Sequence, residues 1–318
     1  MKICWLGFGP GMNETSTGLY QFDPEMLSYF IGRGGAFDRG AISQREHTKV
    51  FTTPQELFSD LEKFDVIIYD TYVFSVRDRP DIVSFLPGNG CITQWDEWMK
   101  LKAKKIMFDG ESVSGKDWHR QHIQYFDYIF TTNPAMPGFY TYFGIDHKPY
   151  KNDGTNDSIK VLYSGSNLDK RYRKILSDFI SKDPKNIILE TLTGFEEWRA
   201  LLNKSKMYLA TFSCASGNMY PMHTKSKEYK ALLCGALPLT EELAEADKFL
   251  IPGKERVTFS DLGDLQKKID YYDKNESERK QIVEAGKKKV IEELNCYVMW
   301  RNAFKAFGII GDDNEKTS

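Results

Sequence analysis

The 318-residue sequence has no long apolar run, only five cysteines and a net charge of only −2. No window approaches the roughly 18 uninterrupted apolar residues of a membrane-spanning helix. The opening stretch, MKICWLGFGPG, is broken by glycine too early for a signal peptide, so we expect a cytoplasmic protein with no membrane partner. The cysteines are scattered without CxxC spacing, which indicates neither a disulfide framework nor a zinc site.

The near-neutral charge, with a pI near 6.3, gives no global attraction to polyanions, so a nucleic-acid partner would need local basic patches. A hydrophobic content of 41% and a charged content of 28% are typical of a globular protein with an ample core. The length fits two domains of roughly 150 residues each.

Apolar runs separated by helical segments predict a parallel sheet covered by helices in the first half of the chain. The expected strands are MKICWLGF, DVIIYD, KKIMFD and DYIFTTN. Asp23 and Pro24 form a helix-start signal, Thr53 and Pro54 form a second one, and QWDEWMKLK predicts a further helix.

The polar, turn-rich stretch from His147 to Ser158 predicts an interdomain linker. The same alternation then restarts with strands IKVLYSG, NIILETL, MYLATF and ALPLT, so we expect two Rossmann-like α/β domains with a cleft between them, at 1–150 and 151–296. A helix at 297–310 places Tyr297, Trp300, Phe304 and Phe307 on one face, and we expect it to pack across the domain junction. Residues 311–318 would form a flexible tail.

Two features of the second domain predict an anion site at one edge of its sheet. A helix that begins near Thr224 would have unpaired amides in its first turn, next to Lys225 and Lys227. A nucleotide diphosphate would bind there, and Glu228 could accept hydrogen bonds from ribose hydroxyls. A lysine-rich, solvated helix start is the alternative interpretation.

The first strand of that domain ends in SGSNLDKRYR, which supplies a second anion signal. Gly165 and Ser166 form a strand-to-helix turn with backbone NH groups, and Arg171 and Arg173 offer guanidinium forks for phosphate. Both signals lie at the carboxyl ends of strands, where α/β sheets bind ligands. An ordinary turn with surface arginines is the alternative.

The stretches SKEYKALLCGALPLTEEL, YYDKNESERKQIVEAGKKKV and MWRNAFKAF together resemble a GT-B glycosyltransferase. Within that class the chain is most similar to the DNA β-glucosyltransferases of T-even phages, with the MKI strand, the glycine-serine turn and the spacing of Lys225 to Glu228. Two positions depart from related patterns: Tyr220 stands where many retaining GT-B families have a glutamate, and Lys225 stands where arginine is common.

The resemblance implies that the first domain binds the acceptor and supplies a general base. It carries the base onto Asp109, at the end of KKIMFD, although an aspartate there could also cap a turn. Further acceptor-binding candidates are Gly9, Glu14, Glu111, Lys116 and Arg120. His119 and His122 lack a third ligand, so zinc is not expected, and Asp109 with Glu111 could hold a divalent ion that the reaction need not require.

The sequence therefore predicts a monomeric glycosyltransferase that uses a UDP-sugar. It would move glucose or arabinose to the hydroxymethyl group of a modified pyrimidine, hydroxymethylcytosine, in double-stranded phage DNA within the host cytoplasm. One alternative is a transferase for bacterial surface polysaccharide, similar to spore-maturation proteins. The other is a nucleotide-sugar- or DNA-binding module without catalysis.

Overall fold

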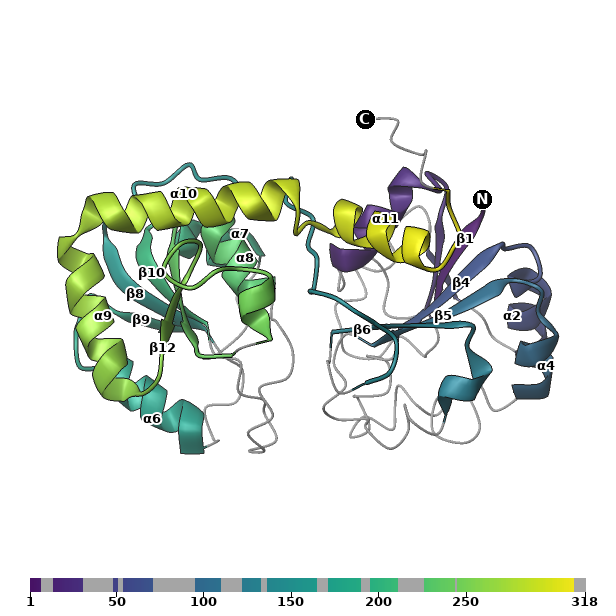
Figure 1. Cartoon of the computed structure of the whole chain (residues 1–318), viewed down its shortest axis with the longest axis horizontal. Coiled ribbons are helices and arrows are strands. Elements are labelled where there is room, and N and C mark those ends of the chain that lie inside the picture. The colour runs from purple at the N-terminus through teal and green to yellow at the C-terminus, as the bar shows by residue number, and fades with distance from the viewer. Residues whose placement is uncertain are drawn as a thin grey trace. The chain divides into compact units, whose positions relative to one another are not determined.

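The computed structural model describes residues 1–6, 14–30, 48–50, 54–70, 95–109, 122–132, 136–164, 171–189, 195–210, 226–243 and 245–311. The chain divides into two compact units (Figure 1). Met1–Asp146 and Cys296–Ser318 make up the first unit, and His147–Asn295 makes up the second. The last helix therefore belongs with the N-terminal sheet, and the tail expected at 311–318 lies, apart from Gly311, outside the described residues.

Within the described residues, the first unit has a sheet of seven parallel strands in the order β3-β2-β1-β4-β5-β6-β7. The strands are β1 (Ile3–Leu6), β2 (Leu27–Phe30), β3 (Thr48–Val50), β4 (Val66–Asp70), β5 (Lys104–Asp109), β6 (Tyr128–Thr131) and β7 (Phe139–Tyr140). The helices are η1 (Glu14–Gln21), α2 (Pro54–Leu61), α4 (Trp95–Lys100), η3 (Ile123–Tyr125) and α11 (Cys296–Ala306). The four strands expected here are confirmed as β1, β4, β5 and β6, each an apolar run buried by helices.

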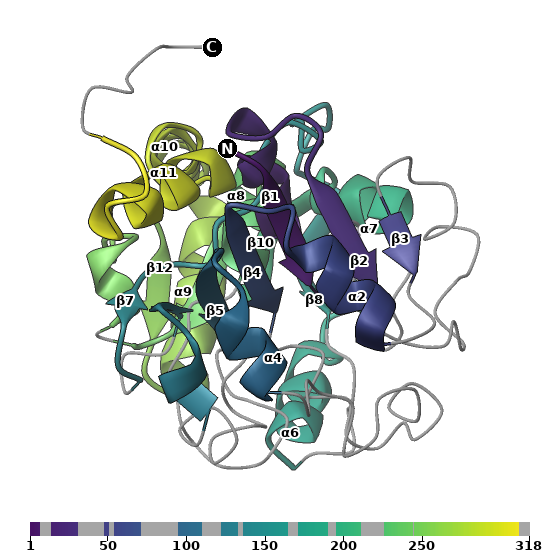
Figure 2. The same cartoon turned by 90° about the vertical axis from the view of Figure 1, so that its right-hand side faces the viewer.

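Helices α2 and α4 cover one face of this sheet (Figure 2). Leu57 and Leu61 of α2 and Trp98 of α4 pack in one cluster with Cys4 of β1 and Ile67 of β4. Leu57 and Leu61 lie one turn apart on α2, and Leu6 and Tyr69, two residues after Cys4 and Ile67, belong to the same cluster, so the periodicity of the sequence accounts for this layer.

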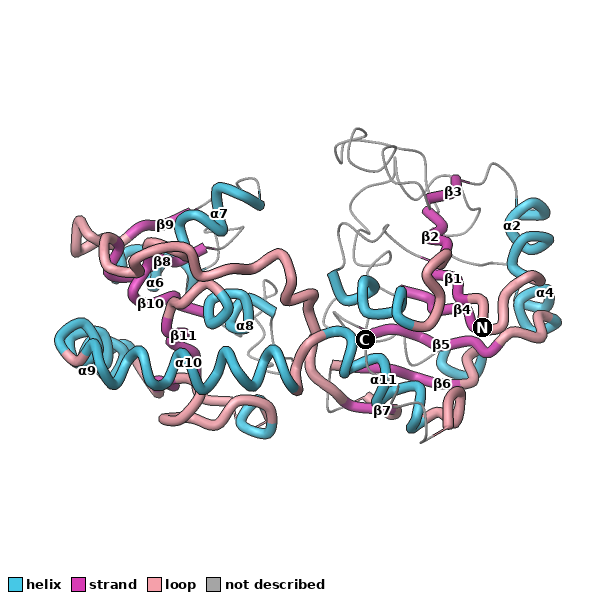
Figure 3. Tube along the Cα trace, turned by 90° about the horizontal axis from the view of Figure 1, so that it is seen from above, coloured by secondary structure: helices cyan, strands magenta, loops and turns pink. Residues whose placement is uncertain are grey.

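The last helix, α11, covers the other face of the first unit's sheet, where it lies along β5 and β6 (Figure 3). Its Trp300 is fully buried, with its ring centroid 4.8 Å from that of Phe130 and 5.7 Å from that of Phe108. The indole Nε1 donates to the carbonyl oxygen of Thr15 at 2.7 Å, so the buried polar group of the tryptophan is satisfied. The aromatic stripe expected on this helix thus packs within the first unit.

The prediction of a helix that starts at Asp23 is wrong. Residues 24 and 25 form a turn, and the chain continues directly into strand β2. The carboxylate of Asp23 accepts hydrogen bonds from the backbone amide of Ile3 at 2.6 Å and from that of Glu25 at 3.2 Å. Asp23 therefore fixes the start of β1 instead of capping a helix.

The second unit has, in the part that the structure describes, a sheet of five parallel strands in the order β12-β11-β10-β8-β9. The strands are β8 (Ile159–Ser164), β9 (Ile187–Leu189), β10 (Ser205–Ala210), β11 (Leu237–Glu241) and β12 (Val257–Phe259). The helices are α6 (Arg171–Ile180), α7 (Phe195–Leu202), α8 (Ser226–Leu233), η4 (Ala246–Lys248), α9 (Leu262–Lys274) and α10 (Glu276–Glu292).

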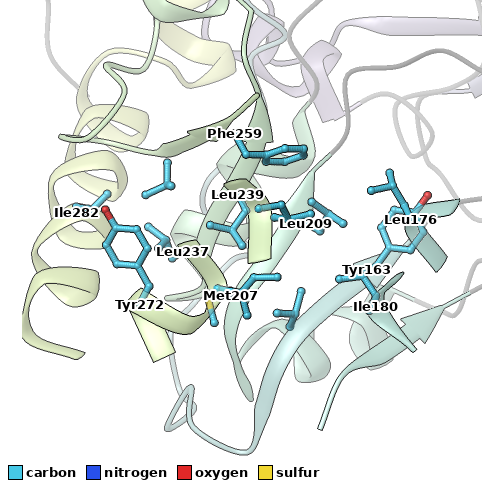
Figure 4. Packing of buried hydrophobic residues seen from close by; sticks show 14 of the residues in the cluster. Tyr163, Leu176, Ile180, Met207, Leu209, Leu237, Leu239, Phe259, Tyr272 and Ile282 are labelled. Carbon is cyan, nitrogen blue, oxygen red and sulfur yellow. The ribbon is translucent and has the colours of Figure 1, made fainter. Parts of the chain in front are cut away.

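The core of the second unit lies between its sheet and the helices α6, α9 and α10. Figure 4 shows Leu209, Leu237 and Leu239 from the central strands at the middle of this core, with Tyr272 of α9 and Ile282 of α10 beside them. Burial of such side chains stabilises the unit by roughly 1.5–3 kcal/mol each. None of the helices among the described residues is long and apolar enough to cross a membrane.

The polar stretch after the first unit is anchored to the second unit by Asn156. Its side-chain Nδ2 donates to three backbone carbonyls, those of Leu202 at 3.0 Å, Ser205 at 3.1 Å and Cys234 at 3.0 Å. The φ of Asn156 is +52°, a left-handed conformation that asparagine tolerates better than most residues. Asn156 is the buried residue of this stretch, and its neighbours from Lys151 to Ser158 are exposed, so its side chain attaches an otherwise exposed segment to the second unit.

Candidate functional site

The two predicted anion signals of the second unit lie at the same edge of its sheet. Strands β8 and β10 are neighbours, β8 ends at Ser164, and α8 begins at Ser226 after β10. Lys227 in the first turn of α8 donates from Nζ to the carbonyl oxygen of Ser164 at 3.0 Å. This bond joins the start of α8 directly to the end of β8.

The predicted phosphate-binding residues lie close in sequence to Ser164 and Lys227, the two residues that this hydrogen bond joins. Gly165 and Ser166 follow Ser164 directly but lie outside the described residues, as does Lys225, which immediately precedes α8. Arg171 and Arg173 form the first turn of α6, and their side chains are not described. The structure joins the residues next to these two turns in the sequence, Ser164 and Lys227, and the placement and contacts of the five predicted residues stay predictions.

The last residue of β8 is also fixed from within the sheet. Its Ser164 hydroxyl lies 2.7 Å from the phenol oxygen of Tyr208 on β10. Tyr208 is fully buried, and burial raises the pKa of its phenol well above the usual value. A neutral phenol is therefore retained as a hydrogen-bond partner for Ser164 directly before the predicted phosphate turn.

Glu228, one turn into α8, is the most unusual charged group of this region. Its side chain is 1% exposed, and Oε2 accepts a hydrogen bond from Nη1 of Arg256 at 3.2 Å. Nη2 of the same arginine contacts Oδ1 of Asp247 at 2.5 Å. The other oxygen of Glu228, Oε1, is buried and has no hydrogen-bond partner among the described residues.

Burial raises the pKa of Glu228 to about 7, because a carboxylate loses the solvation of water there. The positive charge and hydrogen bond of Arg256 oppose this rise, and the negative charge of Asp247 adds to it. A buried carboxylate with one unpaired oxygen costs stability unless a donor reaches it. Oε1 is thus a buried acceptor that lacks a donor among the described residues, and the role predicted for Glu228, binding ribose hydroxyls, stays a prediction.

Sequence reasoning missed Arg256 and Asp247. Both lie in the connection from β11 to β12, Asp247 on η4 and Arg256 immediately before β12. Arg256 is fully buried although it belongs to the charged turn PGKERVTF, which is typical of a solvated loop. No spacing in the sequence relates these residues to Glu228, so no local signal identified them.

In the first unit, Asp109 is the last residue of β5 and is fully buried. Its Oδ2 accepts a hydrogen bond from the hydroxyl of Thr131 on β6 at 2.9 Å, and its carbonyl accepts one from the amide of Thr132 at 3.1 Å. A carboxylate at the carboxyl end of a central strand is the placement that the sequence predicted. Its role as a general base stays a prediction.

A second buried aspartate, Asp70, ends the neighbouring strand β4 and was not among the predicted residues. Asp70 pairs with Phe108 in the sheet register, so its side chain lies on the face opposite to that of Asp109. The two carboxylates therefore do not form a pair that shares a proton. The signal for Asp70, an aspartate directly after an apolar strand, was present in the sequence.

Most of the predicted acceptor-binding residues cannot be placed. Gly9, Glu111, Lys116 and Arg120 lie outside the described residues, as does His119, and Glu14 begins η1 with its side chain not described. His122 is described, and its ring packs 5.1 Å from that of Trp95. No group of three or more His, Cys, Asp or Glu residues that could hold a metal ion occurs in the described part of the chain.

Comparison with known proteins adds to this geometry. Residues 164–303 match a family model described as glycosyl transferase-like, and no curated protein sequence matches the chain. Anabaena Alr3699/HepE in complex with UDP and glucose is similar at a TM-score of 0.67 and 12% identity, over 98% of this chain and 100% of that one. An alpha-glucosyltransferase in complex with UDP-glucose and DNA containing an abasic site is similar at a TM-score of 0.68 and 11% identity, over 97% of this chain and 99% of that one. Sucrose-phosphate synthase from Thermosynechococcus elongatus is similar at a TM-score of 0.59 and 9% identity, over 98% of this chain and 100% of that one.

Likeness at such low identity shows the fold. The predicted α/β class with two Rossmann-like domains is confirmed, and the resemblance to DNA glucosyltransferases holds at the level of the fold, while the β-type resemblance stays a prediction. The chain has the fold of the GT-B glycosyltransferases, and over residues 164–303 it matches the glycosyl transferase-like family.

Proposed function

We propose that the protein is a glycosyltransferase that takes its sugar from a UDP-sugar and holds the donor nucleotide on the second unit. The observation that carries the proposal is the buried Oε1 of Glu228, in the first turn of α8, which has no hydrogen-bond partner in the part of the chain that the structure describes. Support also comes from HepE, solved with UDP and glucose, and from the alpha-glucosyltransferase solved with UDP-glucose. Both have the same fold.

Each part of a UDP-sugar has a partner in this arrangement. The diphosphate would bind at the amides of the first turn of α8, with Lys225 beside it, and at the Gly165–Ser166 turn with Arg171 and Arg173. A ribose hydroxyl would donate to Oε1 of Glu228. The Lys227–Ser164 bond supports one shared site because it joins the end of β8 to the start of α8, the two points that border these turns in the sequence.

Titration with UDP tests the donor site. Glu228→Gln and Arg171→Ala should each weaken UDP binding by roughly 10- to 150-fold, since each loses a hydrogen bond that involves a charged group, worth about 1.5–3 kcal/mol. Lys174→Ala changes an exposed residue of the same helix as Arg171 and serves as the control. Calorimetry that gives wild-type affinity for both site variants, with unfolding curves that show them folded, contradicts the assignment.

We further propose that the acceptor is the hydroxymethyl group of hydroxymethylcytosine in double-stranded DNA, and that the sugar is glucose or arabinose. The alpha-glucosyltransferase of the same fold was solved with DNA containing an abasic site, which supports a DNA acceptor. A target base must leave the stack to react, and lysines and arginines must hold the phosphates.

In this reaction Asp109 accepts the proton of the hydroxymethyl group as its oxygen attacks the anomeric carbon of the sugar, and UDP leaves. The bond from the anomeric carbon to UDP breaks as the new glycosidic bond forms. The hydrogen bond from Thr131 fixes the orientation of the carboxylate before the acceptor binds.

A saccharide acceptor is the second candidate, because the relatives of this fold include an enzyme named for sucrose phosphate. Purified protein mixed with a UDP-sugar and either modified DNA, unmodified DNA or an oligosaccharide separates the possibilities. UDP release only with modified DNA, and binding to that DNA that weakens steeply with salt, is expected. Release only with the oligosaccharide favours the second candidate, and UDP binding without release in any mixture indicates a non-catalytic module.

A further inference from the structure

We propose that Arg256 is a positioning residue of the donor site, which orients Glu228 and keeps it charged, and that Asp247 tunes this effect. The inference rests on the proposed function, because it takes Glu228 to be the partner of the donor ribose. It adds two residues from a different part of the sequence, 19 and 28 positions beyond Glu228.

The geometry gives Arg256 two partners for one guanidinium. Nη1 reaches Oε2 of Glu228 at 3.2 Å, and Nη2 reaches Oδ1 of Asp247 at 2.5 Å. Glu228 and Arg256 have exposed fractions of 1% and 0%, whereas Asp247 is 44% exposed. Because Arg256 occupies Oε2, it is Oε1 that remains as the acceptor for a ligand.

Contacts with the backbone of Arg256 and with the preceding residue, Glu255, hold this turn in place. Its carbonyl accepts a hydrogen bond from the amide of Gly253 at 2.8 Å, which closes the turn before β12. Lys289 of α10 lies 3.3 Å from Oε2 of Glu255, the preceding residue. Gly286 of α10 faces the carbonyl oxygen of Glu255 so closely that a Cβ would lie 2.3 Å from it. The arginine is therefore held in place before any ligand binds.

The charges around Glu228 set how it titrates. Arg256 and Asp247 act on it directly, the first lowering and the second raising the pKa of Glu228. Several other charged groups on α8 and the elements near it have partners elsewhere: Lys227 contacts the carbonyl of Ser164, Lys230 lies over the rings of Tyr150 and Trp198, and Lys289 pairs with Glu255. Lys206 pairs with Asp273, and Glu241 is the last residue of β11.

A ribose hydroxyl that donates to Oε1 favours the ionised form of Glu228, so donor binding should weaken as pH falls through the titration of this group. The limit is about tenfold per pH unit, since one proton must leave for each donor bound. Without Arg256, the midpoint should move up by about 1–3 pH units, the usual effect of an adjacent opposite charge. Without the negative charge of Asp247, it should move down.

The experiment measures the Kd of UDP-glucose by calorimetry between about pH 5.5 and 8.5, where the diphosphate diester does not titrate. Arg256→Gln should shift the midpoint of binding upward and weaken binding roughly tenfold or more near pH 7.5. Asp247→Asn keeps an oxygen for Nη2 and should shift the midpoint downward. Lys248→Gln, next to Asp247 and exposed, is the control that should leave the profile unchanged.

Opposite shifts in the two variants support the inference, because a general loss of stability cannot move the midpoint both ways. A wild-type midpoint in folded Arg256→Gln, or an upward or absent shift in Asp247→Asn, overturns it while leaving the proposed function intact. If Arg256→Gln does not fold, the Asp247→Asn profile decides. Wild-type protein that does not bind UDP-glucose at any pH contradicts the proposed function itself.

Discussion

Asn156 should contribute more to the stability of the second unit than any charged residue of the segment that contains it. Its side-chain amide serves three backbone carbonyls at 3.0, 3.1 and 3.0 Å, from the end of α7, the start of β10 and the turn after α8. The amide has only two protons, so it contributes about two hydrogen bonds to the free energy of unfolding, each about 0.5–1.5 kcal/mol. Its removal also leaves buried carbonyls unpaired, which adds a further penalty. Removal should therefore cost about 2–4 kcal/mol.

Three substitutions separate the contributions of Asn156. Asn156→Gly keeps the positive φ and loses only the hydrogen bonds, whereas Asn156→Ala adds about 1–2 kcal/mol because alanine is strained at this φ. Asn156→Asp has nearly the same shape but points acceptor oxygens at three carbonyl oxygens, so it should be the most destabilising of the three.

Urea unfolding and hydrogen exchange measure these effects. The amides of Asn156 and Ile159, which donate to the carbonyls of Asn203 and Lys204, should exchange faster in each variant. Lys151→Ala alters an exposed residue of the same segment and should stay within about 0.5 kcal/mol of wild type. If Asn156→Asp unfolds at the same urea concentration as wild type, the side-chain hydrogen bonds of Asn156 do not stabilise the second unit.

Two further substitutions test the catalytic proposal and the support of the donor site. Asp109→Asn should lower the rate of single-turnover sugar transfer by about 10²–10⁴-fold, because it removes the proposed base. UDP binding should stay unchanged, because the donor is proposed to bind on the other unit. A nearly wild-type transfer rate would show that the base is another residue, with Glu111 and Glu14 the next candidates. Gly286→Ala should destabilise the protein by about 1–3 kcal/mol in thermal unfolding, since its Cβ would lie 2.3 Å from the carbonyl oxygen of Glu255. Gly263→Ala is the control, since its Cβ would meet a side-chain oxygen, Oδ1 of Asp261, at the longer distance of 3.1 Å. Equal stability of the Gly286→Ala and Gly263→Ala variants would contradict the close approach of α10 to Glu255.

Much of the fold could be predicted because its central strands are continuous apolar runs. β1, β4, β5, β8 and β10 are buried on both faces, and no competing local structure suits such sequences. The helix predicted to start at Thr53 and Pro54 is confirmed as α2, which begins at Pro54.

The error at Asp23 shows where local signals fail. An aspartate followed by proline is a helix start only if the carboxylate binds the amides of its own helix. Here the amide of Ile3, 20 residues earlier, takes that carboxylate, and Leu27–Phe30 pairs with β1 instead. The pairing energy comes from a strand distant in sequence, so no window around Asp23 contains the information.

The same reasoning explains why the sequence led to Glu228 but not to Arg256 in the proposed donor site. Glu228 could be identified because the chain itself places it one turn after Lys225, and helical geometry does the rest. Arg256 follows 28 residues later in a charged turn, and only the sheet order, in which β12 pairs with β11 beside β10, brings that turn next to α8. A fully buried arginine costs several kcal/mol unless a carboxylate pairs with it. Glu228 and Asp247 both pair with this guanidinium and so offset the cost of its burial, and substitution of either carboxylate should change the energetic contribution of the other through the shared guanidinium.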